Sequence, residues 1–290
     1  MDMPKSYRNF AIAALKDSNP TNNSRHTAMD RIVLCMKWGN LFGPDYVNVL
    51  YNACKANMTK PFRFVCLTDN TDGLNEGILA FPIPEIGCTK EMWSSGAWPK
   101  LGVFMQNLYG LKGRALFIDM DTTISGPLDD FFEHTAPLVG IDTGKNWHKG
   151  GTSGQTGAHP PLLGTGVFAF TLGAETQILE RFQSNPEAAF AASKIEQVWV
   201  QEHASSVAYW PNEWVISFKR WLRRPLGVDL FLAPKSPPKG TGMVAFHGDP
   251  RPITLIRPGL SVWDKFPHMG YGQVRWMRDY WLNNGGKLPE

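Results

Sequence analysis

The chain has 290 residues, of which 43% are hydrophobic and 19% are charged, as in an ordinary globular protein with an ample core. A formal net charge of only +3 does not indicate a dedicated nucleic-acid binder. No apolar stretch approaches the roughly 18 residues that span a bilayer, and FAIAAL at 10–15 is too short for a secretory signal. We expect a protein that is soluble or at most peripheral to a membrane.

Residues 1–29 are polar and rich in turn formers, which predicts a flexible N-terminal extension. The next part of the chain alternates apolar runs with helical periodicity. It predicts strands at 31–37, 63–70, 78–84 and 114–119, with helices at 45–57 and 98–110. This order indicates an α/β domain over 30–255, with a mostly parallel central sheet flanked by helices.

The four cysteines all fall in this first part of the chain, and none forms a C-x-x-C pair. Cys35, Cys54 and Cys66 lie inside apolar runs, and Cys88 follows the third predicted strand. This pattern predicts free thiols in a reducing compartment rather than disulfides or zinc ligands. The expected location is the cytoplasm, with peripheral contact to the inner face of the membrane left open.

The pattern after residue 121 is less regular. It predicts a helix over 187–204 and strands at 136–142, 162–170, 207–211, 214–219, 228–234 and 242–248. A Gly-rich loop at 143–161 is long enough to suggest a role in function. The tail at 256–290 is aromatic and basic, and it either packs on the domain, which is slightly favoured, or rests on an anionic membrane.

The stretch LFIDMDTTI, residues 116–124, places Asp119 and Asp121 directly after a buried run. Two carboxylates at such a position repel each other unless a cation lies between them. The D-x-D-x-T pattern is compatible with two chemistries. In a haloacid-dehalogenase-type phosphatase Asp119 would be a phosphoryl-accepting nucleophile. In the second chemistry both aspartates would bind a divalent ion on a nucleotide diphosphate.

The position of this motif favours the metal site. A nucleophile strand of the phosphatase type is normally the first of its sheet, whereas here three predicted strands precede the motif. The stretch FHGDPRP later supplies His247, Gly248 and Arg251 after another apolar run. Imidazole suits Mn²⁺ better than Mg²⁺, glycine lets the backbone approach a diphosphate, and arginine neutralises its charge.

Together the two motifs resemble those of GT-A fold glycosyltransferases, most closely glycosyltransferase family 8 and its relatives. The resemblance covers roughly residues 31–252 and implies a GT-A (Rossmann-like) fold. It implies that Asp119, Asp121 and His247 bind Mn²⁺ or Mg²⁺. Arg251 stands where the family has lysine.

Further matches follow the same layout. Lys100 resembles the basic residue that reaches the donor, and Gly164-Thr165-Gly166 stands in place of the family's asparagine-serine-glycine strand behind the donor sugar. Glu196-Gln197 resembles the Asp-Gln pair near the reacting carbon, where an acidic residue contacts the sugar and glutamine lies opposite the leaving group.

The function implied is metal-dependent transfer of a sugar, with retention of configuration, from a nucleotide diphosphate donor to a hydroxyl acceptor. UDP-sugars are the favoured donors, and a glycan or lipid-linked glycan is the expected acceptor. The nucleoside is expected near Lys37, Trp38 and Thr68-Asp69, and the diphosphate near Lys100, Met120, Gly248 and Arg251. The phosphatase and a non-catalytic carbohydrate-binding relative remain as alternatives.

Overall fold

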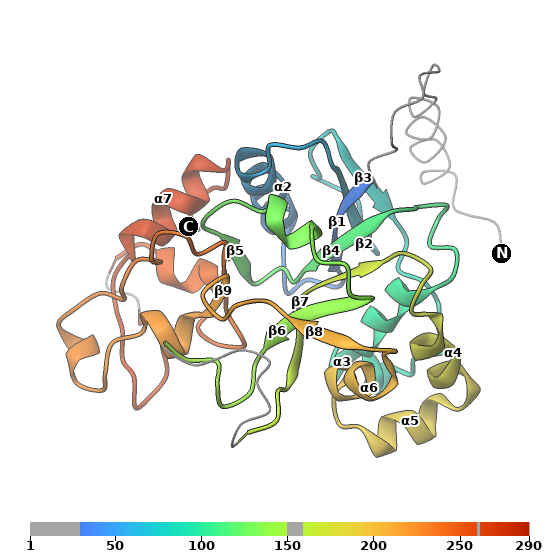
Figure 1. Cartoon of the computed structure of the whole chain (residues 1–290). Helices are drawn as coiled ribbons and strands as arrows, with labels where there is room; N and C mark the ends of the chain where they lie inside the picture. Colours follow the sequence, from blue (N-terminus) through green and yellow to red (C-terminus); the bar gives the residue numbers. More distant parts are fainter. Residues whose placement is uncertain (1–29, 150–158, 260–261, 290) are drawn as a thin grey trace.

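The computed structural model describes residues 30–149, 159–259 and 262–289. The extension predicted for residues 1–29 therefore lies outside the described part. A seven-stranded sheet with strand order β3-β2-β1-β4-β7-β6-β8 forms the centre, and a three-stranded sheet with order β5-β10-β9 lies beside it (Figure 1). The expected α/β class with a mostly parallel central sheet is confirmed.

The first half of the chain builds the parallel part of the large sheet. Strand β1 (Arg31–Lys37) pairs with β2 (Arg63–Thr68) on one side and β4 (Arg114–Ile118) on the other, and β3 (Ile78–Phe81) extends the edge. Helix α2 (Pro44–Asn57) follows β1, as its apolar spacing predicts. Pro44 suits the first helical turn because it needs no amide partner there.

The segment predicted as a helix over 98–110 folds differently. It forms a short 3-10 helix, η1 (Trp98–Phe104), preceded by α3 (Lys90–Ser94), which the sequence pattern did not predict. All seven residues of η1 are buried, and Gly102 packs so closely on Pro84 that an added Cβ would lie 3.0 Å away. Packing on every side therefore selects the tighter helix over the amphipathic one.

The second half completes the large sheet. Strand β7 (Leu163–Thr171) runs antiparallel to both β4 and β6 (Leu138–Asp142), and β8 (Val207–Tyr209) pairs with β6. Helix α4 (Thr176–Ser184) follows β7. The single helix predicted over 187–204 is wrong, because the chain is extended at Ser193 and Ile195. It forms α5 (Pro186–Ala192) and α6 (Glu196–His203) instead.

The small sheet contains β5 (Thr122–Ile124), β10 (Met243–Ala245) and β9 (Val215–Ser217). The strand predicted over 228–234 is absent, because only a short 3-10 helix, η4 (Val228–Leu230), forms there. Its apolar side chains find no sheet to pack against and remain exposed. The remaining short helices are η2 (Asp129–Phe132), the π-type η3 (Phe218–Leu222) and η5 (Pro252–Ile256).

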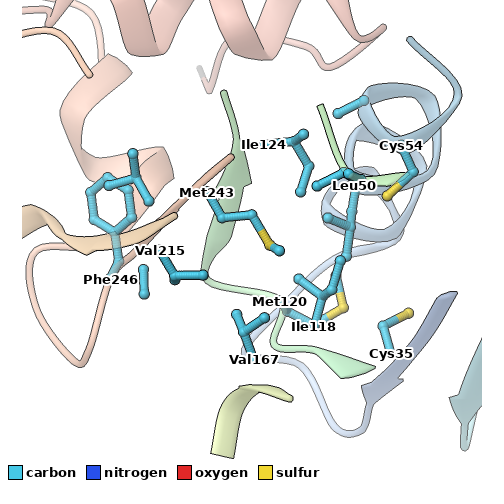
Figure 2. Packing of buried hydrophobic residues seen from close by; sticks show 14 of the residues in the cluster. Cys35, Leu50, Cys54, Ile118, Met120, Ile124, Val167, Val215, Met243 and Phe246 are labelled. Atoms are coloured by element: carbon cyan, nitrogen blue, oxygen red, sulfur yellow. The ribbon is translucent and has the colours of Figure 1, made fainter. Parts of the chain in front are cut away.

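Two hydrophobic cores cover the two faces of the large sheet. One contains η1, α4 and α6, and the other contains α2, the small sheet and the C-terminal helix α7 (Arg275–Asn283). Figure 2 shows how Ile118, Met243 and Leu50 meet in the second core. In the tail, Trp281 of α7 packs edge-to-face on Tyr46 of α2, with ring centroids 4.9 Å apart. None of the helices in the described residues is long and apolar enough to cross a membrane.

Candidate active site

A pocket of about 590 Å³ lies where β1 and β4 end, at the carboxyl edge where ligands bind in open α/β sheets. Of the residues named from the sequence, five line it: Trp38, Lys100, Asp119, Met120 and Asp121. The others come from the end of β1, the loop that follows it and the segment at α3: Met36, Gly39, Asn40, Leu41, Phe42, Trp93, Ser94 and Ala97.

Lys100 sits at the centre of the polar groups at this pocket. It lies on the buried η1, and its Nζ is 2.9 Å from Asp119 Oδ1 and 3.0 Å from Asp119 Oδ2. The same ammonium donates to the carbonyl of Thr165 at 3.0 Å and lies 3.5 Å from Glu196 Oε1. The Thr165 hydroxyl donates to Glu196 at 2.6 Å. Lys100 therefore ties η1, β4, β7 and α6 together.

The carboxylates outnumber the ammonium. Burial lowers the pKa of Lys100, but Asp119 and Glu196 together outweigh it, so the pKa is raised and the lysine stays charged. Burial raises the pKa of Asp119 despite Lys100. Burial and then the nearby Asp119 raise the pKa of Asp121 to about 8. One ammonium thus faces three acidic groups, and this excess favours a further cation in the pocket.

Strand pairing in the small sheet brings the acidic motif at Asp119 and Asp121 next to the turn that begins at His247. Strand β5 follows the acidic pair directly, and β10 runs antiparallel to it with Ala245 opposite Thr122. The amide of Phe246 donates to the carbonyl of Asp121 at 3.1 Å. His247 therefore follows a residue that is hydrogen-bonded to the acidic motif, as the family layout implies.

The imidazole of His247 is engaged elsewhere. Its Nε2 is 2.7 Å from Ser217 Oγ, its ring centroid is 5.4 Å from that of the buried Trp147, and Lys219 donates to its carbonyl at 2.7 Å. Burial and then Lys219 and two arginines lower the pKa of His247 to about 4, so the ring is neutral. In the part of the chain that the structure describes, no three His, Cys, Asp or Glu side chains form a ready metal cluster.

The acidic pair fits a divalent cation, because carboxylate oxygens are the ligands that Mg²⁺ and Mn²⁺ take in such sites and a bound cation would favour the ionised form of both groups. The imidazole of His247 does not join these two carboxylates as a third ligand in the structure. Its hydrogen bond to Ser217 would have to be given up or reorganised before His247 could join Asp119 and Asp121.

Arg251 borders the pocket through an aromatic contact. Its guanidinium carbon lies 5.7 Å from the ring centroid of Phe42, which lines the pocket, and its charge lowers the pKa of Asp121, against the larger effect of burial. Gly248 has a φ of +74°, a conformation that suits glycine. The turn from His247 to Arg251 thus stands beside the pocket rather than in its lining.

The residues expected to bind the nucleoside fall into two groups. Trp38 lines the pocket and meets Trp93 edge-to-face, with centroids 5.8 Å apart. Lys37, the last residue of β1, is buried and does not line the pocket. Asp69 accepts a hydrogen bond from the Gly39 amide at 2.8 Å, so it positions the loop after β1.

The residues expected near the sugar lie behind the acidic pair. Glu196 is buried at the start of α6 within the Lys100 network, and Gln197 follows it in the first turn of that helix. The carbonyl of Gly166 accepts from the Asp119 amide at 2.8 Å, and an added Cβ would lie 3.4 Å from Asp119 Oδ2. Gly164 packs instead on Thr143 and Ile141.

Sequence reasoning missed the wall formed by residues 39–42 and by Trp93 and Ser94. A signal was available for the first part, because GNLFGP directly follows a strand that ends at the ligand-binding edge. For Trp93 no such signal exists, since α3 was not predicted. Part of the Gly-rich loop singled out at 143–161, residues 150–158, lies outside the described residues.

No protein-family model and no curated protein matches the sequence, but solved structures do. The chain is similar over 89% of its length to 98% of the galactosyltransferase LgtC in complex with donor and acceptor sugar analogs, with TM-score 0.55 and 10% identity. Over 93% of its length it is similar to 51% of the bifunctional glycosyltransferase WbbM, with TM-score 0.57 and 13% identity. Over 89% it is similar to 62% of the glycosyltransferase GlyE of Streptococcus pneumoniae TIGR4, with TM-score 0.52 and 10% identity.

At these identities the similarity defines the fold. The chain has the GT-A-like fold of glycosyltransferases, as expected from its two motifs. The acidic pair follows the fourth strand in chain order. In the phosphatase alternative, the motif would normally follow the first strand of a different fold.

Proposed function

We propose that the protein is a metal-dependent glycosyltransferase that moves a sugar from a nucleotide diphosphate donor, with UDP-sugars favoured, to a glycan or lipid-linked glycan. One observation carries the proposal. In a glycosyltransferase fold, Asp119 and Asp121 line a pocket at the carboxyl edge of the sheet. Burial raises the pKa of both carboxyl groups, and Asp119 raises the pKa of Asp121 further. Such a pair is suited to binding a cation together with an anionic ligand.

Asp119 and Asp121 would hold Mn²⁺ or Mg²⁺, with His247 as the third ligand that the family resemblance implies. The two carboxylates fit this role as they stand, whereas His247 would have to leave Ser217. When bound, the ion offsets the charge that develops on the leaving diphosphate.

The protein's own groups position the donor. Lys100 holds the carboxylate of Asp119 through both oxygens and adds a positive charge at the pocket, where a diphosphate would bind. Arg251, on the ring of Phe42, supplies a second cation at the rim. Trp38 offers an aromatic face for the base, and Asp69 keeps the loop after β1 in place.

The stereochemical part of the proposal concerns the start of α6. A structure of LgtC is described as an active-site mutant in which glutamine is replaced by glutamate. Gln197 is the residue that the family resemblance aligns with such a glutamine. We assign Gln197 to the face of the sugar opposite the leaving group. Glu196, which Lys100 holds in place, would contact the sugar hydroxyls. The expected outcome is retention of configuration.

A thermal-shift screen of UDP, GDP, CDP and ADP, each with and without Mn²⁺, tests the proposal. We expect stabilisation by UDP that requires Mn²⁺, since a ligand that binds the folded state raises the melting temperature. Asp121→Asn should abolish the metal-dependent part, and the exposed Asp130→Asn serves as the control. Metal-independent stabilisation that is equal in Asp121→Asn and wild type would contradict the proposal.

A turnover assay distinguishes an enzyme from a non-catalytic carbohydrate-binding protein. Incubation with UDP-sugars and Mn²⁺ should release UDP slowly by hydrolysis, and the anomer of the released sugar reports retention or inversion. Nucleotide binding without any release of UDP, with or without added glycan acceptors, would favour the binding protein.

A further inference from the structure

A second surface of the molecule, outside the pocket, gathers exposed apolar side chains. Of the thirteen large apolar side chains exposed in the described residues, nine fall in 226–232 and 262–271, which we name the η4 surface. Phe231 and Phe266 are 83% and 87% exposed. In Figure 1 these orange segments, between β9 and α7, form the end of the molecule away from α4 and α5. Clusters of this kind on soluble proteins usually mark an interaction site.

Two buried carboxylates, Asp229 and Asp264, connect the second segment of the η4 surface to the chain in and just before the first. His268 Nδ1 lies 2.8 Å from the buried carboxylate of Asp229, and Arg223 Nε lies 3.2 Å from that of Asp264. Backbone pairing from Trp263 to Gly270 closes the second segment into a hairpin. These contacts fix the backbone of both segments and so keep the apolar side chains exposed to solvent. In a loosely packed loop, the same side chains would turn toward the core.

The chain that carries the first segment of the η4 surface is basic. The segment 219–239 contains six Lys or Arg residues and one acidic residue, Asp229, which is buried and hydrogen-bonded to His268. Arg223, Arg224 and Lys235 lie within three positions of the exposed apolar run, and Lys239 follows it further along the chain. In the hairpin, Asp264 is paired with Arg223, so its charge is also offset. An apolar centre with a basic rim is complementary to an anionic lipid bilayer.

The aromatic side chains of α7 do not take part in this surface. Trp281 is buried, and Trp276 and Tyr280 pack against the core. Among the described residues, exposed large apolar side chains are therefore concentrated on the η4 surface, whereas α7 contributes Leu282 at 37% exposure. This surface is also connected to the candidate active site, because Lys265 of the hairpin pairs with Asp249 at 2.5 Å, two residues after His247.

We propose that the η4 surface docks on a bilayer that contains anionic phospholipids, with Phe231 and Phe266 inserted at the interface and the basic rim on the headgroups. Docking would place the turn at His247 near the bilayer and so orient the pocket relative to it. The proposal does not depend on the proposed function, since vesicle binding requires neither a donor nor turnover.

The test is co-sedimentation of the full chain with vesicles of phosphatidylcholine, alone or mixed with phosphatidylglycerol. We expect binding to the mixed vesicles that weakens with salt and is much lower on phosphatidylcholine alone. Phe231→Ser and Phe266→Ser should each weaken binding about tenfold. Lys235→Ser should weaken it about fivefold.

Matched controls are Leu282→Ser, a partly exposed apolar residue of α7, and the exposed Lys112→Ser. Both should bind as the wild type does, and all variants should keep its melting temperature. The proposal is overturned if neither vesicle binds the chain, or if Phe231→Ser and Phe266→Ser bind like the controls. It is also overturned if light scattering shows a dimer that these two substitutions convert to monomer, because the surface would then join two copies of the chain.

Discussion

Replacing Lys100 by methionine removes the ammonium that faces Asp119, Glu196 and Asp121 while keeping the length of the side chain. Lys100 is almost fully buried, and its Nζ makes close contacts with both oxygens of Asp119 and with the carbonyl of Thr165. Removing one partner of a buried ion pair costs about 3–5 kcal/mol. Asp119 keeps 34% of its side chain exposed, so water screens part of this loss and we expect about 3 kcal/mol.

For a chain of this size, a loss of about 3 kcal/mol corresponds to a fall in melting temperature of about 6–12 °C. The assay is thermal unfolding at neutral pH in metal-free buffer, with the exposed Lys112→Met as control. Adding Glu196→Gln to Lys100→Met should recover part of the stability, because it removes one of the uncompensated carboxylates. A melting temperature for Lys100→Met within a degree of wild type would refute the reasoning that this lysine offsets the acidic groups.

Three further substitutions follow from the geometry. Asp121→Asn should raise the melting temperature in metal-free buffer, and the gain should grow from about pH 4 to about pH 8. Over that range the carboxyl of Asp121 ionises freely in the unfolded chain but keeps its proton in the folded chain, so a rise in pH favours unfolding of the wild type and not of the variant. Asp69→Ala should raise the KM for the donor about fivefold with little change in melting temperature, because the Gly39 amide loses its acceptor. Gly126→Ala should lower the free energy of unfolding by about 2 kcal/mol in urea titration, since its Cβ would lie 2.6 Å from the carbonyl of Thr241.

Each of these has its own check. A stability gain for Asp121→Asn that is the same at every pH would show that charge is not the cause. Asn70→Ala, at the neighbouring position, is the comparison for Asp69→Ala, and equal effects on KM would remove the role assigned to Asp69. Gly43→Ala, where an added Cβ meets nothing within 4 Å, is the control for Gly126→Ala and should be near neutral.

The sequence predicted the strands of the parallel half well, because each of β1, β2 and β4 is a continuous buried run, which is the pattern of a sheet covered on both faces. It also predicted the acidic pair at the strand edge, since two carboxylates after such a run have few structural explanations. These features depend on local composition alone. They could therefore be identified without knowing what packs against them.

The features that were missed depend on distant parts of the chain. Trp98 starts a 3-10 helix because both sides of that segment are buried, which its own spacing does not reveal. Phe231 resembles a strand residue in an apolar run, yet no sheet edge lies beside it. The bond from His247 to Ser217 joins residues thirty positions apart, so only the fold shows that the imidazole is engaged.

The pairing of the small sheet has a consequence for how the protein acquires its site. Strands β5, β9 and β10 come from distant positions in the chain, and β10 lies between the other two. Because β10 holds the turn at His247 against the acidic motif, the site is complete only after residues beyond 245 have been synthesised and have entered the sheet. A growing chain can pair β1 with β2 and β4, and β2 with β3, much earlier, since those pairings need only residues up to 118. Assembly of the candidate site is therefore a late event in biogenesis, and a nascent chain that has folded only its first half does not yet have the complete site.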